Sequence, residues 1–256
     1  MICLKALRGS LPALRVVCAR YQFLDSFLDT TRSVVQRMMP ELPFDLFDPE
    51  AEVGITERQL PHWFQSGVIT FVTFRTADSI PQVVLLRWHN ELRDWLEHRG
   101  VAMMANAPVP KVESLPAELQ GPYRQQRFHK WNDHLDNCHG ECLLRQRDLA
   151  EIVLSSLRHF DTQRYELDSC IVMPNHVHLL AAFHLPTTCR AQSESWLHFT
   201  AFQINQRLNR KGEFWQSEPF DHLVRSPEQY LYLRKYSAEN GIKARLPPTD
   251  YLYWSR

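Results

Sequence analysis

Two histidines, His176 and His178, stand two residues apart in an apolar stretch, "CIVMPNHVHLLAAF" (Cys170–Phe183). In a strand, residues i and i+2 point to the same face, with their Cα atoms about 7 Å apart. Two imidazoles in that arrangement suit one divalent cation, while Val177 between them would point into the core. Two surface histidines on the polar face of a strand would give the same pattern, so the spacing alone leaves both interpretations open.

Several enzyme classes that use a strand His-x-His are excluded by the context. Fewer than 80 residues follow His178, too few for an amidohydrolase barrel of about 250 residues that carries the pair on its first strand. A cupin would need a glutamate shortly afterwards, and "LLAAFHLPTT" contains none. A histidine-triad hydrolase would need a third histidine where Leu180 stands.

Partners for the histidines must therefore come from elsewhere, and the last helical segment offers Tyr236 and Asn240. These residues are spaced i, i+4, so they share one face of a helix. A phenol with a pKa of about 10 is a poor nucleophile at neutral pH. Beside a cation that polarises a phosphodiester it could attack phosphorus, and an Asn amide oxygen could complete the metal shell. Tyr230, Tyr232 and Tyr236 could equally be core or surface aromatics.

The elements that must position these residues follow from periodicity and turn signals. Strands are expected over residues 67–76, 164–173 and 176–183, with Pro174 and Asn175 as the turn of a hairpin, and a short strand within 213–224. Helices are expected over 83–100, 122–135, 147–160, 193–212 and 226–241. The last begins with Ser226 as N-cap and Pro227 at N1, and is expected to end before Gly241.

This order of elements predicts an α+β fold. We expect a ferredoxin-like antiparallel sheet with helices on one face, a helical insertion after the first strand, and an added C-terminal helix. Residues 1–56 are predicted to be a poorly ordered N-terminal extension, and residues 57–256 a single domain.

Composition sets further limits. The formal net charge is zero, which argues against a strongly cationic nucleic-acid binder, although residues 186–256 hold ten Lys and Arg against seven Asp and Glu. No apolar run reaches the roughly 20 residues that span a bilayer. The six cysteines form no dense framework, which favours reduced thiols and a cytoplasmic location. "CHGEC" (Cys138–Cys142) lacks the second Cys/His pair of a structural zinc site.

Between Arg58 and Leu246 the sequence resembles the REP-associated tyrosine transposases, within the single-tyrosine HUH transposases. The strongest piece is "MPNHVHLL" (Met173–Leu180), which is similar to the His-hydrophobe-His signature of that family with its preceding Met-Pro-Asn. "RQLPHWFQSGVITFVTFRTADSIP" (Arg58–Pro81) resembles the first strand of the family and the segment before it. "FWQSEPFDHLVRSPEQYLYLRKYSAENGIKARL" (Phe214–Leu246) resembles the segment with Trp-Gln, an Asp-His pair and the helix that carries the nucleophile.

The resemblance implies Mg²⁺- or Mn²⁺-dependent cleavage of single-stranded DNA, with strand transfer. His176 and His178 match the metal ligands, Asn240 a third ligand, and Tyr236 the nucleophile that forms a 5′-phosphotyrosine. The expected partner is single-stranded or hairpin-forming palindromic DNA, and the expected state is a monomer or homodimer outside any membrane. The basic residues predicted to contact DNA are Arg207, Arg210, Lys211, Arg225, Arg234, Lys235 and Lys243.

The sequence departs from the family pattern at the end of the last helix. Gly241 and Arg245 stand where the family commonly has a proline and a glycine, and Gly241 is expected to loosen the helix end that holds Asn240. Two other function classes remain: a DNA-binding protein that has lost catalysis, and a metallophosphoesterase that acts on small nucleotides.

Overall fold

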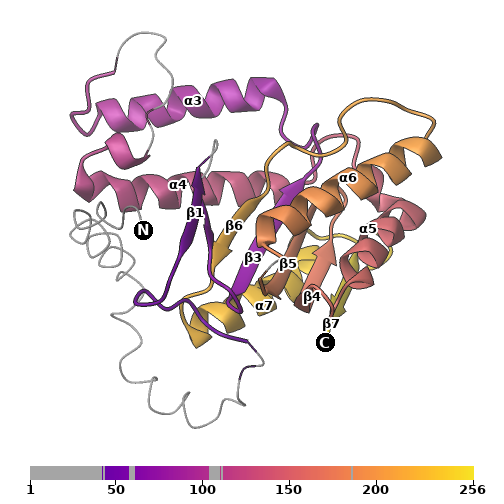
Figure 1. Ribbon diagram of the computed structural model, residues 1–256. Coiled ribbons are helices and arrows are strands. Elements are labelled where there is room, and N and C mark those ends of the chain that lie inside the picture. The colour runs from indigo at the N-terminus through magenta and orange to yellow at the C-terminus, as the bar shows by residue number, and fades with distance from the viewer. Residues whose placement is uncertain (1–41, 43, 58–60, 104–109, 111, 186) are drawn as a thin grey trace, which may run out of the picture. The chain divides into compact units, whose positions relative to one another are not determined.

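The computed structural model describes residues 42, 44–57, 61–103, 110, 112–185 and 187–256 (Figure 1). These residues form an α+β fold, as predicted, and divide into two compact units. Residues 110–127 belong to the first unit, while 44–109 and 128–256 form the second. Most of the predicted N-terminal extension lies outside the described residues, but residues 44–56 belong to the second unit.

The second unit is built on a five-stranded antiparallel sheet with strand order β6-β3-β5-β4-β7, and a separate two-stranded sheet pairs β1 with β2. The strands are β1 (Gly54–Glu57), β2 (Pro61–Phe64), β3 (Ile69–Arg75), β4 (Tyr165–Val172), β5 (His176–Phe183), β6 (Phe220–Leu223) and β7 (Leu252–Ser255). Elements β3, α5, β4, β5, α6 and β6 follow the ferredoxin-like βαββαβ arrangement. Strand β7 is added at the edge beside β4.

The described helices are α3 (Gln82–Glu97), α4 (Ala117–Asp136), α5 (Arg147–His159), α6 (Cys189–Arg207) and α7 (Pro227–Lys243). Helices α3 and α4 form the predicted insertion between β3 and β4. Helices α5 and α6 lie side by side on one face of the sheet (Figure 1). Alternate residues of the central strands, such as Val72, Val177 and Leu179, pack against Val153 and Trp196 of these helices, as the two-residue period of a strand requires.

Helix α7 covers the opposite face of the sheet and packs on β4 and β5 (Figure 1). Ser226 caps its N-terminus by accepting a hydrogen bond from the backbone N–H of Gln229 at 3.2 Å, and Pro227 occupies the first turn. Because both faces of the sheet are covered, all eight residues of β5 are buried. The interpretation of His176 and His178 as surface residues on a polar face is therefore wrong.

Several elements differ from the sequence prediction. The sequence predicts no strand before β3, yet the described residues there form the paired strands β1 and β2, and β7 was not predicted either. Strands of four residues carry little local signal and gain stability from their neighbours. Helix α6 begins at Cys189 instead of residue 193, because Thr188 accepts a hydrogen bond from the N–H of Ala191 and caps the helix there.

Helix α7 continues through Gly241 to Lys243, so the expected end before Gly241 is wrong. The helix closes with a Schellman motif: Arg245 donates its N–H to the carbonyl of Ile242, and Leu246 donates to Gly241, both at 2.9 Å. Arg245 occupies the left-handed position of this motif with φ of 54°, where glycine is usual.

Replacing Arg245 with glycine is expected to stabilise the protein by about 0.5–1 kcal/mol. The left-handed conformation costs a residue with a Cβ about 1–2 kcal/mol, and the extra freedom of glycine in the unfolded chain offsets part of that gain. Urea denaturation of Arg245→Gly beside Arg245→Ala measures the effect, since alanine keeps the Cβ. Equal midpoints for the two variants would contradict the conformational explanation.

Candidate functional site

The two histidines begin β5 on the sheet face that α7 covers. His176 pairs in register with Arg75 of β3, and His178 with Thr73. Both imidazoles are fully buried, and their ring centroids lie 4.7 Å apart. Val177 belongs to the core on the α5–α6 side, as predicted. The strand therefore brings two adjacent imidazoles to one buried face.

The residue before the pair, Asn175, fixes the tautomer of His176. The Nδ2 of Asn175 donates to the carbonyl of His139 at 2.8 Å, and this bond turns its Oδ1 toward the Nδ1 of His176, also at 2.8 Å. An amide oxygen can only accept, so Nδ1 carries the proton. The Nε2 of His176 therefore keeps the lone pair that a metal ion would need.

Thr73 and Phe71 hold the ring of His178. The Oγ1 of Thr73 lies 2.7 Å from Nδ1 of His178, and the ring of Phe71 stacks on the imidazole with centroids 5.3 Å apart. Burial lowers the pKa of His178 to about 3. Burial, followed by repulsion from His178, also lowers the pKa of His176 well below its usual value. Both imidazoles are therefore neutral at physiological pH.

Tyr236 is the tyrosine of α7 that lies against the histidine pair. Its ring meets that of His178 edge-on with centroids 5.3 Å apart, and that of Phe71 at 6.5 Å. Tyr230 instead donates its hydroxyl to the carboxylate of Asp168 at 2.8 Å, and burial is the main cause that raises its pKa. Tyr232 lies one turn before Tyr236 and is 60% exposed. The fold thus separates Tyr236 from Tyr230 and Tyr232, because of the three only Tyr236 has its ring against that of His178 among the described contacts.

Asn240 lies one helical turn after Tyr236 and is fully buried. It belongs to the stripe of α7 that faces the sheet, together with Leu233 and Ser237. Gly241 beside it is also buried, and a Cβ added there would lie 2.4 Å from the ring of Tyr251. The glycine admits this ring close to the helix within an intact final turn, so the expected loosening beside Asn240 is wrong. A role of Asn240 as third metal ligand stays a prediction.

Three of the basic residues predicted to bind DNA lie at or after the end of α6. Arg207 forms an ion pair with Asp148 of α5 at 2.6 Å, so it belongs to the sheet face opposite the histidines. Arg210 pairs with Glu141 at 3.0 Å, and Lys211 is exposed. Their contact with DNA stays a prediction.

Three further candidates lie on α7. Arg234 is engaged with Asp168, a buried carboxylate of β4, at 3.4 Å. Lys235 and Lys243 both pair with Glu239, at 3.8 and 3.5 Å. The Nζ of Lys243 also lies 5.2 Å from the ring centre of Tyr236. The structure thus brings Lys243 to the candidate nucleophile.

The sequence prediction omitted the residues that orient the histidines. Asn175 was assigned only to a turn, and Thr73 only to a strand. His222 of β6 lies on the same face, with its ring 5.5 Å from that of Phe71. Burial and then the charge of Arg225 lower the pKa of His222 to about 4. The available signal was the position of Asn175 directly before His176, whereas Thr73 and His222 required the sheet register.

A metal ion at this site would need a mixed set of donors. Among the described residues, no three His, Cys, Asp or Glu side chains are grouped to hold a metal ion, which applies to "CHGEC" as well. Two neutral imidazoles with oriented rings nevertheless fit a divalent cation. The buried Nε2 of His178 has no hydrogen-bond partner in the part of the chain that the structure describes. An amide oxygen and oxygens of a bound phosphodiester and water would have to complete the shell.

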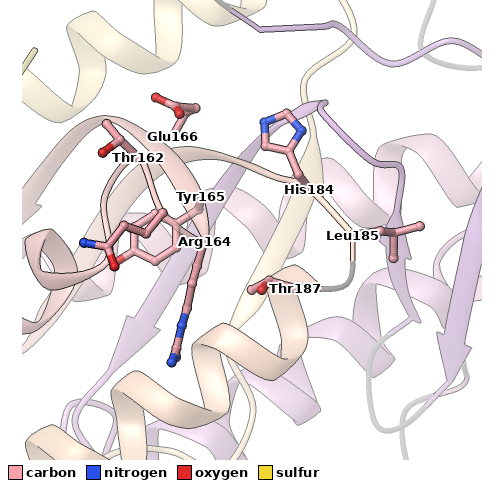
Figure 2. A pocket seen from close by; sticks show the side chains of 8 residues that line it. Thr162, Arg164, Tyr165, Glu166, His184, Leu185 and Thr187 are labelled. Carbon is pink, nitrogen blue, oxygen red and sulfur yellow. The ribbon is translucent and has the colours of Figure 1, made fainter.

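A small pocket lies at the other end of the β4–β5 hairpin. Figure 2 shows Thr162, Arg164, Tyr165 and Glu166 at the start of β4, with His184, Leu185 and Thr187 after the end of β5. The cavity measures about 110 Å³, and the histidine pair begins β5 at the opposite end of that strand. The pocket is therefore separate from the candidate site.

No family model matches the chain, and no curated protein does. Among solved structures, a similar one is a REP-associated tyrosine transposase bound to a REP hairpin. It shares 12% sequence identity and a TM-score of 0.36, and the alignment covers 76% of this chain and 89% of that one. A likeness this distant carries no conclusion about the function of this chain.

None of the described helices is both long enough and apolar enough to cross a bilayer.

Proposed function

We propose that the protein is a metal-dependent endonuclease and strand transferase for single-stranded DNA, in which Tyr236 is the nucleophile. The observation that carries the proposal is the ring of Tyr236 at 5.3 Å from that of His178, which itself lies 4.7 Å from His176. A tyrosine ring beside two neutral imidazoles that would hold a cation fits transfer of a phosphodiester to the phenolic oxygen. The sequence resemblance supports the same activity.

His176, His178 and Asn240 are the side chains that would hold the cation. When bound, a Mg²⁺ or Mn²⁺ ion supplies Lewis-acid polarisation of a non-bridging phosphoryl oxygen. Asn175 and Thr73 keep the two imidazole rings in place. Burial keeps both rings neutral, so their lone pairs are available at physiological pH.

The reaction replaces one phosphodiester with another. The phenolic oxygen of Tyr236 forms a bond to phosphorus, and the bond between phosphorus and the 3′-oxygen breaks. The leaving 3′-oxygen takes up a proton in place of the one that the phenol loses. The products are a 5′-phosphotyrosine and a free 3′-hydroxyl, and attack by another 3′-hydroxyl reverses the step without ATP.

The proposed partner is single-stranded DNA with a hairpin beside the cleavage site, as the family resemblance implies. Lys235 and Lys243 on α7, and Arg225 before it, are the first candidates for phosphate contacts. Arg234 is also close to Tyr236 in sequence, but it is engaged with Asp168.

The test is incubation of the full chain with labelled hairpin-bearing oligonucleotides and Mn²⁺. We expect a covalent protein–DNA species that resists denaturing electrophoresis, requires the metal, and is absent with His176→Ala. Binding without cleavage, unaffected by His176→Ala, would favour a catalytically inactive DNA-binding protein. Turnover of small phosphodiesters with no adduct would indicate a metallophosphoesterase. Either outcome contradicts the proposal.

The depressed pKa of His178 predicts metal binding that tolerates mild acid. Protons compete with a metal for the imidazole lone pair, and a pKa of about 3 confines that competition to a low pH range. We expect Mn²⁺ affinity to fall less than about threefold between pH 7.5 and 5.5. Two histidines with an ordinary pKa of about 6.5 would each lower the Mn²⁺ affinity about tenfold over the same pH range.

Titration of free Mn²⁺ by electron paramagnetic resonance at the two pH values measures this affinity. His178→Ala serves as the control and is expected to bind weakly at both. If the Mn²⁺ affinity of the unmodified protein fell tenfold or more between the two pH values, the histidines would have ordinary pKa values.

A further inference from the structure

Two aromatic side chains border the candidate site but remain open to solvent. Tyr232 of α7 is 60% exposed, and Phe220 of β6 is 41% exposed. Burial of large aromatic rings is energetically favourable. Exposed rings beside a polar site are therefore candidates for contact with a ligand.

Tyr232 stands directly beside the nucleophile. It precedes Tyr236 by one helical turn, and the two rings are nearly parallel, with an interplanar angle of 19° and centroids 6.4 Å apart. Because Tyr232 is mostly exposed, a planar group that stacks on it would lie one helical turn from Tyr236. If the planar group is a base, the sugar-phosphate backbone attached to it would bring a phosphate near Tyr236.

Phe220 borders the same site from the edge of the sheet. It pairs in register with Thr73, which itself pairs with His178. Its ring lies 5.7 Å from that of His222, so both side chains occupy the sheet face that carries the histidines. Phe220 therefore stands two strands from His178 in one row across the sheet.

The charges around Tyr232 fit a nucleic-acid strand. Lys235 is 73% exposed at its side chain, and Lys243 lies close to the ring of Tyr236. Exposed aromatic rings interleaved with basic side chains are typical of surfaces that bind single strands, because every base has a stacking face and every linkage a negative charge.

We propose that Tyr232 and Phe220 are stacking platforms for unpaired bases next to the phosphodiester that Tyr236 attacks. This inference rests on the proposed function, and it names how the substrate is held at that site. Stacking does not depend on base identity, so these residues position the strand and contribute little sequence preference.

The test is the dissociation constant of a hairpin oligonucleotide with a single-stranded tail, measured by fluorescence anisotropy with EDTA present so that no cleavage occurs. Tyr232→Ala is expected to weaken binding about 5- to 100-fold, while Tyr232→Phe keeps the affinity. Phe220→Ala is also expected to weaken binding. The matched control is Phe202→Ala, because Phe202 is 59% exposed but lies on α6, on the other face of the sheet.

A second measurement separates stacking from phosphate contact. Tyr232→Ala should leave the salt dependence of binding unchanged, whereas Lys235→Ala should reduce it. A 2-aminopurine in the tail should be quenched by the unmodified protein and not by Tyr232→Ala.

Tyr232→Ala that binds like the unmodified protein, while that protein still forms the covalent adduct, would overturn the stacking inference alone. Equal losses for Tyr232→Phe and Tyr232→Ala would also overturn it. An unmodified protein that neither binds nor cleaves single-stranded DNA would overturn the proposed function, and the inference with it.

Discussion

Replacing Tyr236 with phenylalanine is expected to abolish the covalent protein–DNA adduct, so that its rate of formation falls at least about 10³-fold. The substitution removes the hydroxyl and keeps the ring that contacts His178 and Phe71. Folding and DNA binding should therefore change little, and the defect should lie in the chemical step. Denaturing electrophoresis of a labelled oligonucleotide measures the adduct, and anisotropy measures binding.

Tyr232→Phe is the matched control, since it removes a hydroxyl one turn earlier on the same helix. It should keep the adduct. Mass spectrometry of the digested adduct should place the phosphate on Tyr236. An adduct that persists in Tyr236→Phe, or one mapped to Tyr232, would show that the histidine contact does not select the nucleophile.

Gly241→Ala is expected to destabilise the protein by about 1 kcal/mol. The added Cβ would lie 2.4–2.5 Å from three ring carbons of Tyr251, whereas carbon atoms in contact stand about 3.5–4.0 Å apart. Forcing the ring or the helix aside costs about 1–3 kcal/mol. The intrinsic preference works in the other direction, because alanine is favoured over glycine within a helix by about 0.5–1 kcal/mol.

Gly121→Ala in α4 is the control for a helical glycine in open space, because a Cβ added at Gly121 meets nothing within 4 Å apart from its chain neighbours. Alanine is favoured within a helix by about 0.5–1 kcal/mol, but Pro122 follows and disfavours helical backbone at a residue with a Cβ. That variant should therefore change the free energy of unfolding by less than about 1 kcal/mol. Urea denaturation of both variants, with a double-mutant cycle that adds Tyr251→Ala, measures the clash. If Gly241→Ala proved stabilising, or if Tyr251→Ala did not relieve its effect, the close approach of the ring would not explain the glycine.

Much of the fold could be predicted because the local signals are strong. The apolar alternation of β3, the hairpin of β4 and β5, and the N-cap of α7 are each visible in a few consecutive residues. The elements that could not be predicted are those whose formation depends on contacts with distant segments. Strands β1, β2 and β7 are four residues long, and pairing with a neighbouring strand is what defines them. The approach of the Tyr251 ring to Gly241 in α7 likewise follows from the fold and not from the local sequence.

The sequence by itself determined that His176 and His178 share one face of a strand, and that Tyr236 and Asn240 share one face of a helix, because both periodicities are properties of the backbone. The tertiary structure alone decided that these two faces meet. Helix α7 covers the sheet face opposite α5 and α6, so the histidines become buried and neutral, and Tyr236 lies against His178 while Tyr230 is bound to Asp168. Which face a helix covers is set by packing among distant segments, and no local pattern encodes that choice.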